Sequence, residues 1–467
     1  MRHPAPVPGP GTEACLRAGA AAVSITPEAG IGLQGYGVRI AEGVDEALIS
    51  SALVIGSDEI DWLLISLDLI GIDRTFTARI RKTLAKRLAV RPERITLACS
   101  HTHSGPPSLP RLGPVTSDEA YLDLLEARVL EVAQTAAAFR QPVTLRIGVT
   151  DVLENINRRE RKNGRIELGV DPDGPVDHRV WVGRFDALGG PIDAPMALVV
   201  QYACHATCSA ETSNLSSDWP GVMRRTVQQL YERDRTRPVI CFVQGCAGDV
   251  THRIGRDPRS WPEHFGAATS LQASIMGRLV ATGAIAASER AEPARAARVF
   301  VTSTPIALPF RGVSGSERTE LQVVRMGASL PADVSPATWF LFLPGEPLAA
   351  YGDALSRAFT ARFGARPNDV VVCGYANDAV GYLCTPQALQ EGGYEAADAH
   401  RVYHRPAAFA DTTLSVIQRA CTVAAAGLGQ DPGRWRAAAV TVRSLVETVR
   451  SFVTRRYSRI FPAGPLA

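Results

Sequence analysis

The sequence predicts an α/β protein of the mixed α+β kind, with one large domain built round a mixed β-sheet and flanking helices, followed by a helical carboxy-terminal tail. Short apolar runs rich in β-branched residues alternate with longer segments of helical period. Of the 467 residues, 46% are hydrophobic and 21% are charged, which is typical of a compact folded protein rather than a disordered one. Such alternation places helices over the faces of a sheet and function in the loops at its strand ends.

The individual elements follow from these patterns. Apolar runs predict strands at residues 22–25, 52–55, 62–67, 95–99, 143–149, 196–203, 239–244, 299–304, 338–343 and 369–374. Residues 180–186 and 196–203 flank the turn sequence LGGP and predict a hairpin that leads into His205. Segments with the period of amphipathic helices lie at residues 75–88, 117–139, 221–233, 267–289 and 347–363.

The chain divides into three predicted regions. Residues 1–15 are rich in proline and are expected to form a flexible tail, residues 16–405 carry the alternating pattern, and residues 406–467 form a helical extension. Within the extension, residues 434–460 combine apolar side chains at helical spacing with several arginines. We expect a basic amphipathic helix there, which either docks on the domain or makes peripheral contact with an anionic membrane.

Composition excludes some classes of function. Lys and Arg number 50 and Asp and Glu 47, so the net charge of +3 does not predict a nucleic-acid partner. The amino terminus lacks the apolar run of a signal peptide, and no apolar stretch is long enough to span a membrane, so a cytoplasmic location is expected. Nine cysteines without a C-x-x-C pair predict reduced, mostly buried thiols.

Residues with catalytic potential follow several of the predicted strands. His101 and His103 follow the run at 95–99. In an extended chain their Cα atoms would lie about 6.5 to 7 Å apart, and both side chains would point to the same side of the strand. His205 follows another strand, and Glu346 follows a third. Each has a structural alternative, such as a satisfied core histidine or a carboxylate at a helix start, so only their convergence would predict a metal site.

The order of the motifs is more specific than any one of them. The stretches SHTHSGP, CHAT with SSDWPG, QGCAGDV, LPGEP, and NDAVGYLCTP followed by GYEAA occur in turn along the chain. Together they resemble the neutral ceramidase family over residues 21–403. The resemblance implies that residues 16–405 form a ceramidase-like catalytic domain.

The resemblance also implies a set of site residues. The ligands of a zinc ion would be His101, His205, Glu346 and Tyr382. The residues acting on the substrate would be His103, Arg158, Tyr394 and Thr251, the last of which stands where the family has a serine. A second, structural divalent cation, Ca²⁺ or Mg²⁺, would involve Asp249 and Asp398. Asp249 alone would otherwise be interpreted as a turn-capping carboxylate.

The resemblance implies a zinc-dependent hydrolase that cleaves the amide bond of a ceramide-like or other N-acyl compound, within sphingolipid or other lipid metabolism. Two alternatives stay open: an N-acyl transferase running the reverse reaction, and a lipid-binding or scaffolding module of the same fold that has lost activity.

A serine hydrolase is disfavoured because the G-x-S-x-G motif is absent. The sequence GIGLQG at 30–35 is interpreted as a glycine-rich loop, because no helical pattern follows it. Residues 105–117 and 253–264 are expected to select the substrate, and the sequence does not predict the oligomeric state.

Overall fold

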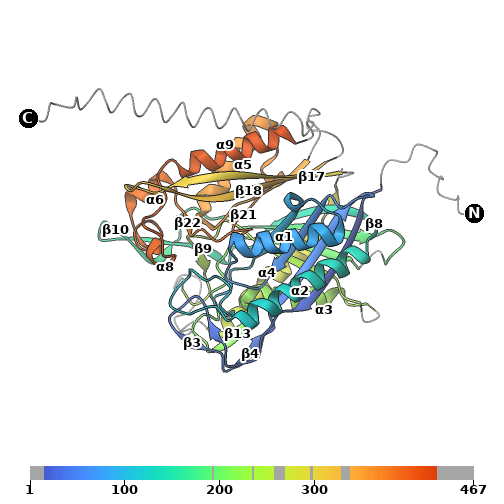
Figure 1. Cartoon of the computed structure of the whole chain (residues 1–467), viewed down its shortest axis with the longest axis horizontal. Coiled ribbons are helices and arrows are strands. Elements are labelled where there is room, and N and C mark those ends of the chain that lie inside the picture. The colour runs from blue at the N-terminus through green and yellow to red at the C-terminus, as the bar shows by residue number, and fades with distance from the viewer. Residues whose placement is uncertain are drawn as a thin grey trace, which may run out of the picture.

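The computed structural model describes residues 15–191, 194–233, 236–256, 269–294, 298–327 and 337–428. In this part of the chain, a large curved β-sheet has helices on its outer face, and a smaller sheet with its own helices packs against its inner face (Figure 1). The predicted class, a mixed sheet flanked by helices, is confirmed. The sequence pattern had not separated the two sheets.

The large sheet is a mixed sheet in the order β14-β12-β11-β8-β1-β5-β6-β7, with β16 also paired to β8. Its strands are β1 (Arg17–Ser24), β5 (Ile49–Gly56), β6 (Trp62–Leu67), β7 (Ile95–Cys99), β8 (Gln141–Asp151), β11 (Arg179–Ala187), β12 (Ala197–Tyr202), β14 (Val239–Gln244) and β16 (Glu292–Pro293). The pairs β6–β7 and β12–β14 are parallel, and the other neighbours are antiparallel. The sheet curls enough to bring β6 close to β14, since Ser66 Oγ on β6 donates to the Phe242 carbonyl on β14 at 2.6 Å.

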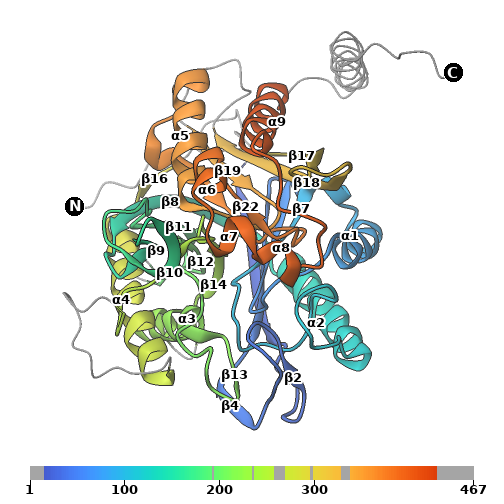
Figure 2. The same ribbon diagram turned by 90° about the vertical axis from the view of Figure 1, so that its left-hand side faces the viewer.

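Alternation of side chains along the strands explains how the large sheet is covered. On β12, Leu198 and Val200 pack with α3 (Asp218–Tyr231) and α4 (Ser270–Glu289), whereas Ala197 and Val199 face the smaller sheet. On β5, the outward residues contact α1 (Arg74–Leu88) and α2 (Glu119–Ala138). Both helix pairs lie on the outer face of the curved sheet. Figure 2 shows α3 and α4 along its left part and α1 and α2 along its right part.

The smaller sheet has the order β17-β18-β19-β21. It comprises β17 (Arg298–Pro309), β18 (Ser316–Gly327), β19 (Ala337–Phe342) and β21 (Val370–Cys373). Phe340 and Phe342 of β19 pack against the large sheet, where their rings lie 5.4 and 5.9 Å from that of Trp62. The alternate residues Trp339 and Leu341 pack with α5 (Ala349–Phe363) and α9 (Thr413–Gly427).

Short elements cover the ends of the two sheets. They are β2 (Gly32–Leu33), β3 (Arg39–Ile40), β4 (Gly43–Glu46), β9 (Asn155–Lys162), β10 (Arg165–Asp171), β13 (Asn214–Ser216), β15 (Val250–His252), β20 (Glu346–Pro347), β22 (Tyr382–Leu383), the helices α6 (Pro386–Glu391), α7 (Tyr394–Ala397) and α8 (Ala399–Val402), and 3₁₀ turns at Pro92–Arg94 and Pro367–Asp369. The pairs are β2–β3, β4–β13, β20–β22 and the three-stranded β10-β9-β15. Figure 2 shows α6 to α8 lying together with β22 and close to β9 and β10.

Most predicted elements are found at or near their expected bounds. The strands predicted at 62–67, 95–99 and 239–244 are β6, β7 and β14, and the predicted hairpin is the β11–β12 pair. The strands β9, β10 and β18 were not predicted, because charged and polar residues interrupt their apolar patterns. The nine cysteines are free thiols, and all except Cys15 are buried.

Two predicted segments lie outside the described residues. They are nearly all of the amino-terminal tail, at residues 1–14, and the basic amphipathic helix at 434–460. The start of the predicted helix at 267–289 and part of the loop at 253–264 lie outside them too. No helix within the described ranges has the length and apolarity needed to cross a membrane.

Parallel pairing brings several chain segments to one end of the molecule. His101 follows β7, and His205 follows β12, whose parallel neighbour β14 ends at Gln244. Glu346 follows β19, which is parallel to β21. The carboxyl ends of parallel strands are where α/β sheets commonly place ligands, and His101, His205 and Glu346 gather there.

Candidate metal and active site

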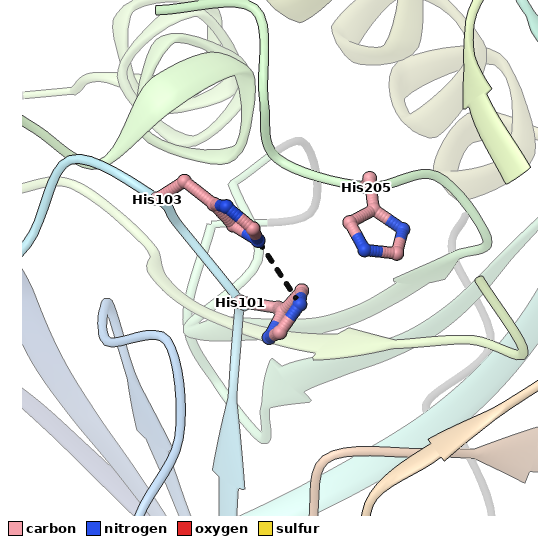
Figure 3. Close-up of side chains that lie close together, drawn as sticks. All are labelled: His101, His103 and His205. Carbon is pink, nitrogen blue, oxygen red and sulfur yellow. Dashed lines mark hydrogen bonds between the residues drawn. The ribbon is translucent and has the colours of Figure 1, made fainter. Parts of the chain in front are cut away.

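Three histidines form a cluster at the strand ends. The ring nitrogens of His101, His103 and His205 that face the cluster lie within 4.8 Å of one another. Figure 3 shows the three rings pointing toward a common centre, two from the loop after β7 and one from the loop after β12. The centroids of the three rings lie 4.8 to 5.7 Å apart. Histidines from two separate loops therefore converge, which is the condition set above for a metal site.

The orientation of two of these rings is set by backbone carbonyls. His101 Nδ1 lies 2.6 Å from the Ile70 oxygen, and His205 Nδ1 lies 2.5 Å from the Ala247 oxygen. A carbonyl oxygen only accepts, so both Nδ1 atoms carry the proton and donate it. Each Nε2 atom therefore presents a lone pair to the centre of the cluster, which is the arrangement that metal-binding histidines use.

Glu346 completes an inward-facing group of acceptors. Its Oε2 atom lies 3.1 Å from His101 Nε2 and 3.3 Å from His205 Nε2. All three side chains are buried, and neither Glu346 Oε2 nor His205 Nε2 has a hydrogen-bond donor within the described part of the chain. Buried acceptors repel one another unless a positive charge lies between them, so these residues fit a bound cation.

Charge effects agree with neutral imidazoles that offer lone pairs at the centre. Burial lowers the pKa of His205 to about 4. The Glu346 side chain is also held by Tyr403, whose hydroxyl donates to Oε1.

Local backbone geometry explains how Glu346 and Tyr382 come together. They are register partners in the short parallel pair β20–β22, and the Glu346 amide donates to the Gly381 carbonyl at 2.9 Å. The preceding residue, Gly345, has a φ of +78°, and a Cβ there would lie 2.3 Å from the Gly381 oxygen. Only glycine fits at this position of the LPGEP motif. His101 also has positive φ, at +65°, a conformation that is uncommon for residues other than glycine.

Gln244 joins the two loops that carry the histidines. Its side-chain amide nitrogen donates to the carbonyls of Ser100 and Cys204 at 3.0 and 2.8 Å. These residues immediately precede His101 and His205. The same side chain accepts from the amide of Cys204 at 3.2 Å, so one buried glutamine at the end of β14 sets the spacing of both loops.

Arg158 lies between two tyrosines on the other side of the site. Its Nη2 atom donates to the Tyr382 hydroxyl at 2.9 Å, and its guanidinium carbon lies 5.9 and 6.0 Å from the rings of Tyr382 and Tyr394. Burial raises the pKa of Tyr394 to about 12, so this phenol keeps its proton near neutral pH. The neighbouring Arg159 instead donates to the Gly392 carbonyl and to Glu395. Of the two arginines, Arg158 therefore contacts the tyrosines.

The other predicted residues have structural partners of their own. Thr251 is buried in β15 opposite Ile156 of β9. Asp249 accepts from the Ala349 amide at 2.7 Å and from Asn157 at 3.1 Å, and burial raises its pKa to about 6. Asp398 is exposed and pairs with Arg401. The second cation, with Asp249 and Asp398 as its ligands, stays a prediction.

Four residues of the site were not predicted: Gln244, Tyr375, Glu395 and Tyr403. The ring of Tyr375 lies 4.3 Å from that of His101. Glu395 accepts from Arg158 and Arg159 at 2.8 and 2.9 Å. Gln244 and Glu395 do lie inside quoted motifs, but nothing in the local pattern indicates which partners they meet.

Two solved structures resemble this chain over most of its length. The neutral ceramidase from Pseudomonas aeruginosa superimposes with a TM-score of 0.71, covering 88% of this chain and 74% of that one at 17% sequence identity. The chain has the neutral ceramidase fold. A second structure, a ceramidase complexed with C2, gives a TM-score of 0.69 at 17% identity and covers 88% of this chain and 75% of its own. No protein-family model and no curated protein matches the sequence.

At this identity the likeness is one of fold, and at that level it confirms the resemblance predicted from the ordered motifs. The residues that carry those motifs are also the ones that form the site in this chain. The neutral ceramidase fold here places the histidine cluster at the carboxyl ends of parallel strands, with Glu346 and Tyr382 paired beside it.

Proposed function

We propose that this protein is a zinc-dependent hydrolase that cleaves the amide bond of an N-acyl, lipid-like substrate. The observation that carries the proposal is the buried group of lone pairs formed by His101 Nε2, His205 Nε2 and Glu346 Oε2. Nitrogen and carboxylate ligands in this combination suit Zn²⁺. Tyr382, the register partner of Glu346, is proposed as the fourth ligand.

Zinc in such a site supplies a Lewis acid that polarises a carbonyl group and lowers the pKa of water. The residues of the chain orient the substrate around it. Arg158, held by Glu395, presents a fixed positive charge, and Tyr394 presents a protonated phenol. Both are donors suited to the oxygen of an amide carbonyl, where negative charge develops during hydrolysis.

His103 is proposed as the residue that moves a proton. Its Nε2 atom lies 3.2 Å from His101 Nε2, at the edge of the lone-pair group, and its side chain is only partly buried. It can therefore contact both the site and an entering substrate, which a general acid or base requires. Thr251 is proposed to supply a hydroxyl in place of the serine of the resembled family. All these residues lie within 16–405, the proposed catalytic domain.

The fold likeness supports a lipid-like amide as the substrate class, since the two similar structures are ceramidases. The chemistry of the site equally accommodates the reverse acyl transfer, because the same carbonyl oxygen must be stabilised in either direction. A lipid-binding module without activity is the other candidate. Turnover measurements distinguish hydrolysis, acyl transfer and lipid binding without activity.

The decisive experiment is elemental analysis of the purified protein, compared with a variant in which His101 and His205 are both replaced by Ala. We expect about one zinc per chain in the wild type and none in the variant. The wild type should then release fatty acid from an N-acyl amide panel. Wild-type protein that is folded, metal-free and unable to take up zinc would overturn the proposal. Zinc-loaded protein that binds acyl lipid without hydrolysis or transfer would favour the binding module.

A further inference from the structure

The glycine-rich loop at the amino-terminal end of the domain lies directly against His103. The turn between β2 and β3 spans residues 34–38, and Gln34 pairs with Gly105 across a short antiparallel bridge. Gly35 has a φ of +127°, and a Cβ placed on it would lie 2.7 to 2.8 Å from three atoms of His103. The turn can approach the imidazole this closely only because residue 35 has no side chain.

Arg39 fastens this turn to the strand ends of the site. Its guanidinium donates to three backbone carbonyls, those of His103 at 2.5 Å, Thr212 at 2.7 Å and Tyr36 at 3.1 Å. The three acceptors belong to three separate segments: the histidine loop, the segment before β13, and the turn itself. One side chain thus holds the turn in place beside His103.

Tyr36 occupies the outer side of His103. The two ring centroids lie 4.9 Å apart with an interplanar angle of 44°. His103 Nε2 faces His101 on the inner side, whereas the Tyr36 side chain is 45% exposed. The Tyr36 ring therefore contacts the imidazole and is also open to solvent. Two further apolar residues of the same hairpin, Val38 and Ile40, are exposed as well.

We propose that Tyr36 is a specificity-determining residue, which contacts the acyl chain of the substrate, while the turn positions His103. The inference rests on the proposed function and extends it to a defined contact. The Arg39 guanidinium donates its hydrogen bonds to backbone carbonyls. The turn therefore presents the aromatic ring of Tyr36 to the substrate rather than a charged group. Loss of an aromatic contact of this size lowers affinity by roughly tenfold or more.

The test compares Tyr36→Ala and Tyr36→Phe on two amides of the same amine, one acylated with dodecanoate and one with acetate. Tyr36→Ala should raise KM for the dodecanoyl amide about tenfold and change KM for the acetyl amide much less. Tyr36→Phe keeps the ring and should recover the wild-type KM. An equal effect on both amides, or no effect on either, would overturn the contact.

The positioning role is tested with Gly35→Ala and the matched control Gly37→Ala. Gly37 also has positive φ, at +52°, but a Cβ there meets no atom within 4 Å. Gly35→Ala should change the rate at which diethyl pyrocarbonate modifies His103, followed by peptide mass spectrometry, while Gly37→Ala should not. Zinc content and melting temperature show whether each variant is folded. The same modification rate in both variants would exclude a positioning role.

A second readout keeps the inference separate from the proposed function. If the wild type hydrolyses no N-acyl amide, calorimetric titration with dodecanoate still tests the contact. Wild type should bind this fatty acid about tenfold more tightly than Tyr36→Ala. Equal affinities, or no binding to either protein, would overturn the assignment of Tyr36.

Discussion

Arg158 and Glu395 form an ion pair in which the guanidinium Nε lies 2.8 Å from a carboxylate that is wholly shielded from solvent. The same carboxylate accepts from Arg159 at 2.9 Å. Burial alone would raise the pKa of Glu395, but Arg158 outweighs it and keeps that pKa below its ordinary value, so the pair is charged. Glu395 therefore positions Arg158 against Tyr382.

Replacing Glu395 by Gln should lower kcat by at least about tenfold, because Arg158 loses the charged partner that orients it. KM and zinc content should change much less. Glu391→Gln is the matched control, since Glu391 pairs with Arg159 and Arg161 and not with Arg158. Steady-state kinetics of both variants decide the matter, and equal losses in the two would assign Glu395 a merely structural role.

Tyr403→Phe should weaken zinc binding by about 10- to 100-fold, because it removes the hydroxyl that donates to Glu346. Chelator competition measures the affinity. Tyr351→Phe serves as control, since Tyr351 is an equally buried tyrosine whose hydroxyl donates to the Cys384 carbonyl instead. Unchanged zinc affinity in Tyr403→Phe would show that this hydrogen bond does not tune the site.

Gln244→Leu should lower the free energy of unfolding by about 2 to 4 kcal/mol, because it leaves the carbonyls of Ser100 and Cys204 without their donor. The two histidine loops would also lose their common anchor, so zinc retention should fall. Urea unfolding and elemental analysis provide the measurements. Gln141→Leu, on the exposed start of β8, should change neither quantity.

Asp378 should make stability depend on pH. Burial raises its pKa to about 6 from an ordinary value of 3.8, and Thr319 donates to the carboxyl at 2.8 Å. A raised carboxyl pKa means that the folded state binds the proton more tightly. The resulting stability is fully present below about pH 4 and is lost as the pH rises through about 6.

Asp378→Asn removes this titration while keeping an oxygen for Thr319. The stability of wild type relative to the variant should therefore fall by up to about 3 kcal/mol between about pH 4 and pH 7. Urea unfolding of both proteins across this range gives the difference directly. Parallel curves would mean that Asp378 titrates near its ordinary value.

Thr251 can be tested with a pair of substitutions of opposite chemistry. Thr251→Val keeps the shape and removes the hydroxyl, and should lower kcat about tenfold or more if that hydroxyl serves the reaction. Thr251→Ser restores the residue of the resembled family and should retain turnover. A Thr251→Val protein with wild-type kinetics would remove Thr251 from the catalytic group.

Parts of the site could be predicted because their signals are local. A strand of apolar residues followed by His101 and His103 is visible within nine residues, ITLACSHTH, and the glycine of LPGEP is visible as a motif. Gln244, Glu395 and Tyr403 could not be assigned in this way. Their partners lie 144, 237 and 57 residues away along the chain, and no periodicity encodes such a distance.

The sequence by itself determined most of the strands and long helices, and which histidine and glutamate side chains follow the strands, because apolar periodicity and turn residues act over short distances. Only the tertiary structure decided that the Nε2 atoms of His101 and His205 meet the same oxygen of Glu346, and that Gly35 lets Tyr36 lie against His103. The physical reason is that these contacts depend on the curl of one sheet, the pairing of parallel strands and the close approach of backbones. Those features arise only when the whole core is packed.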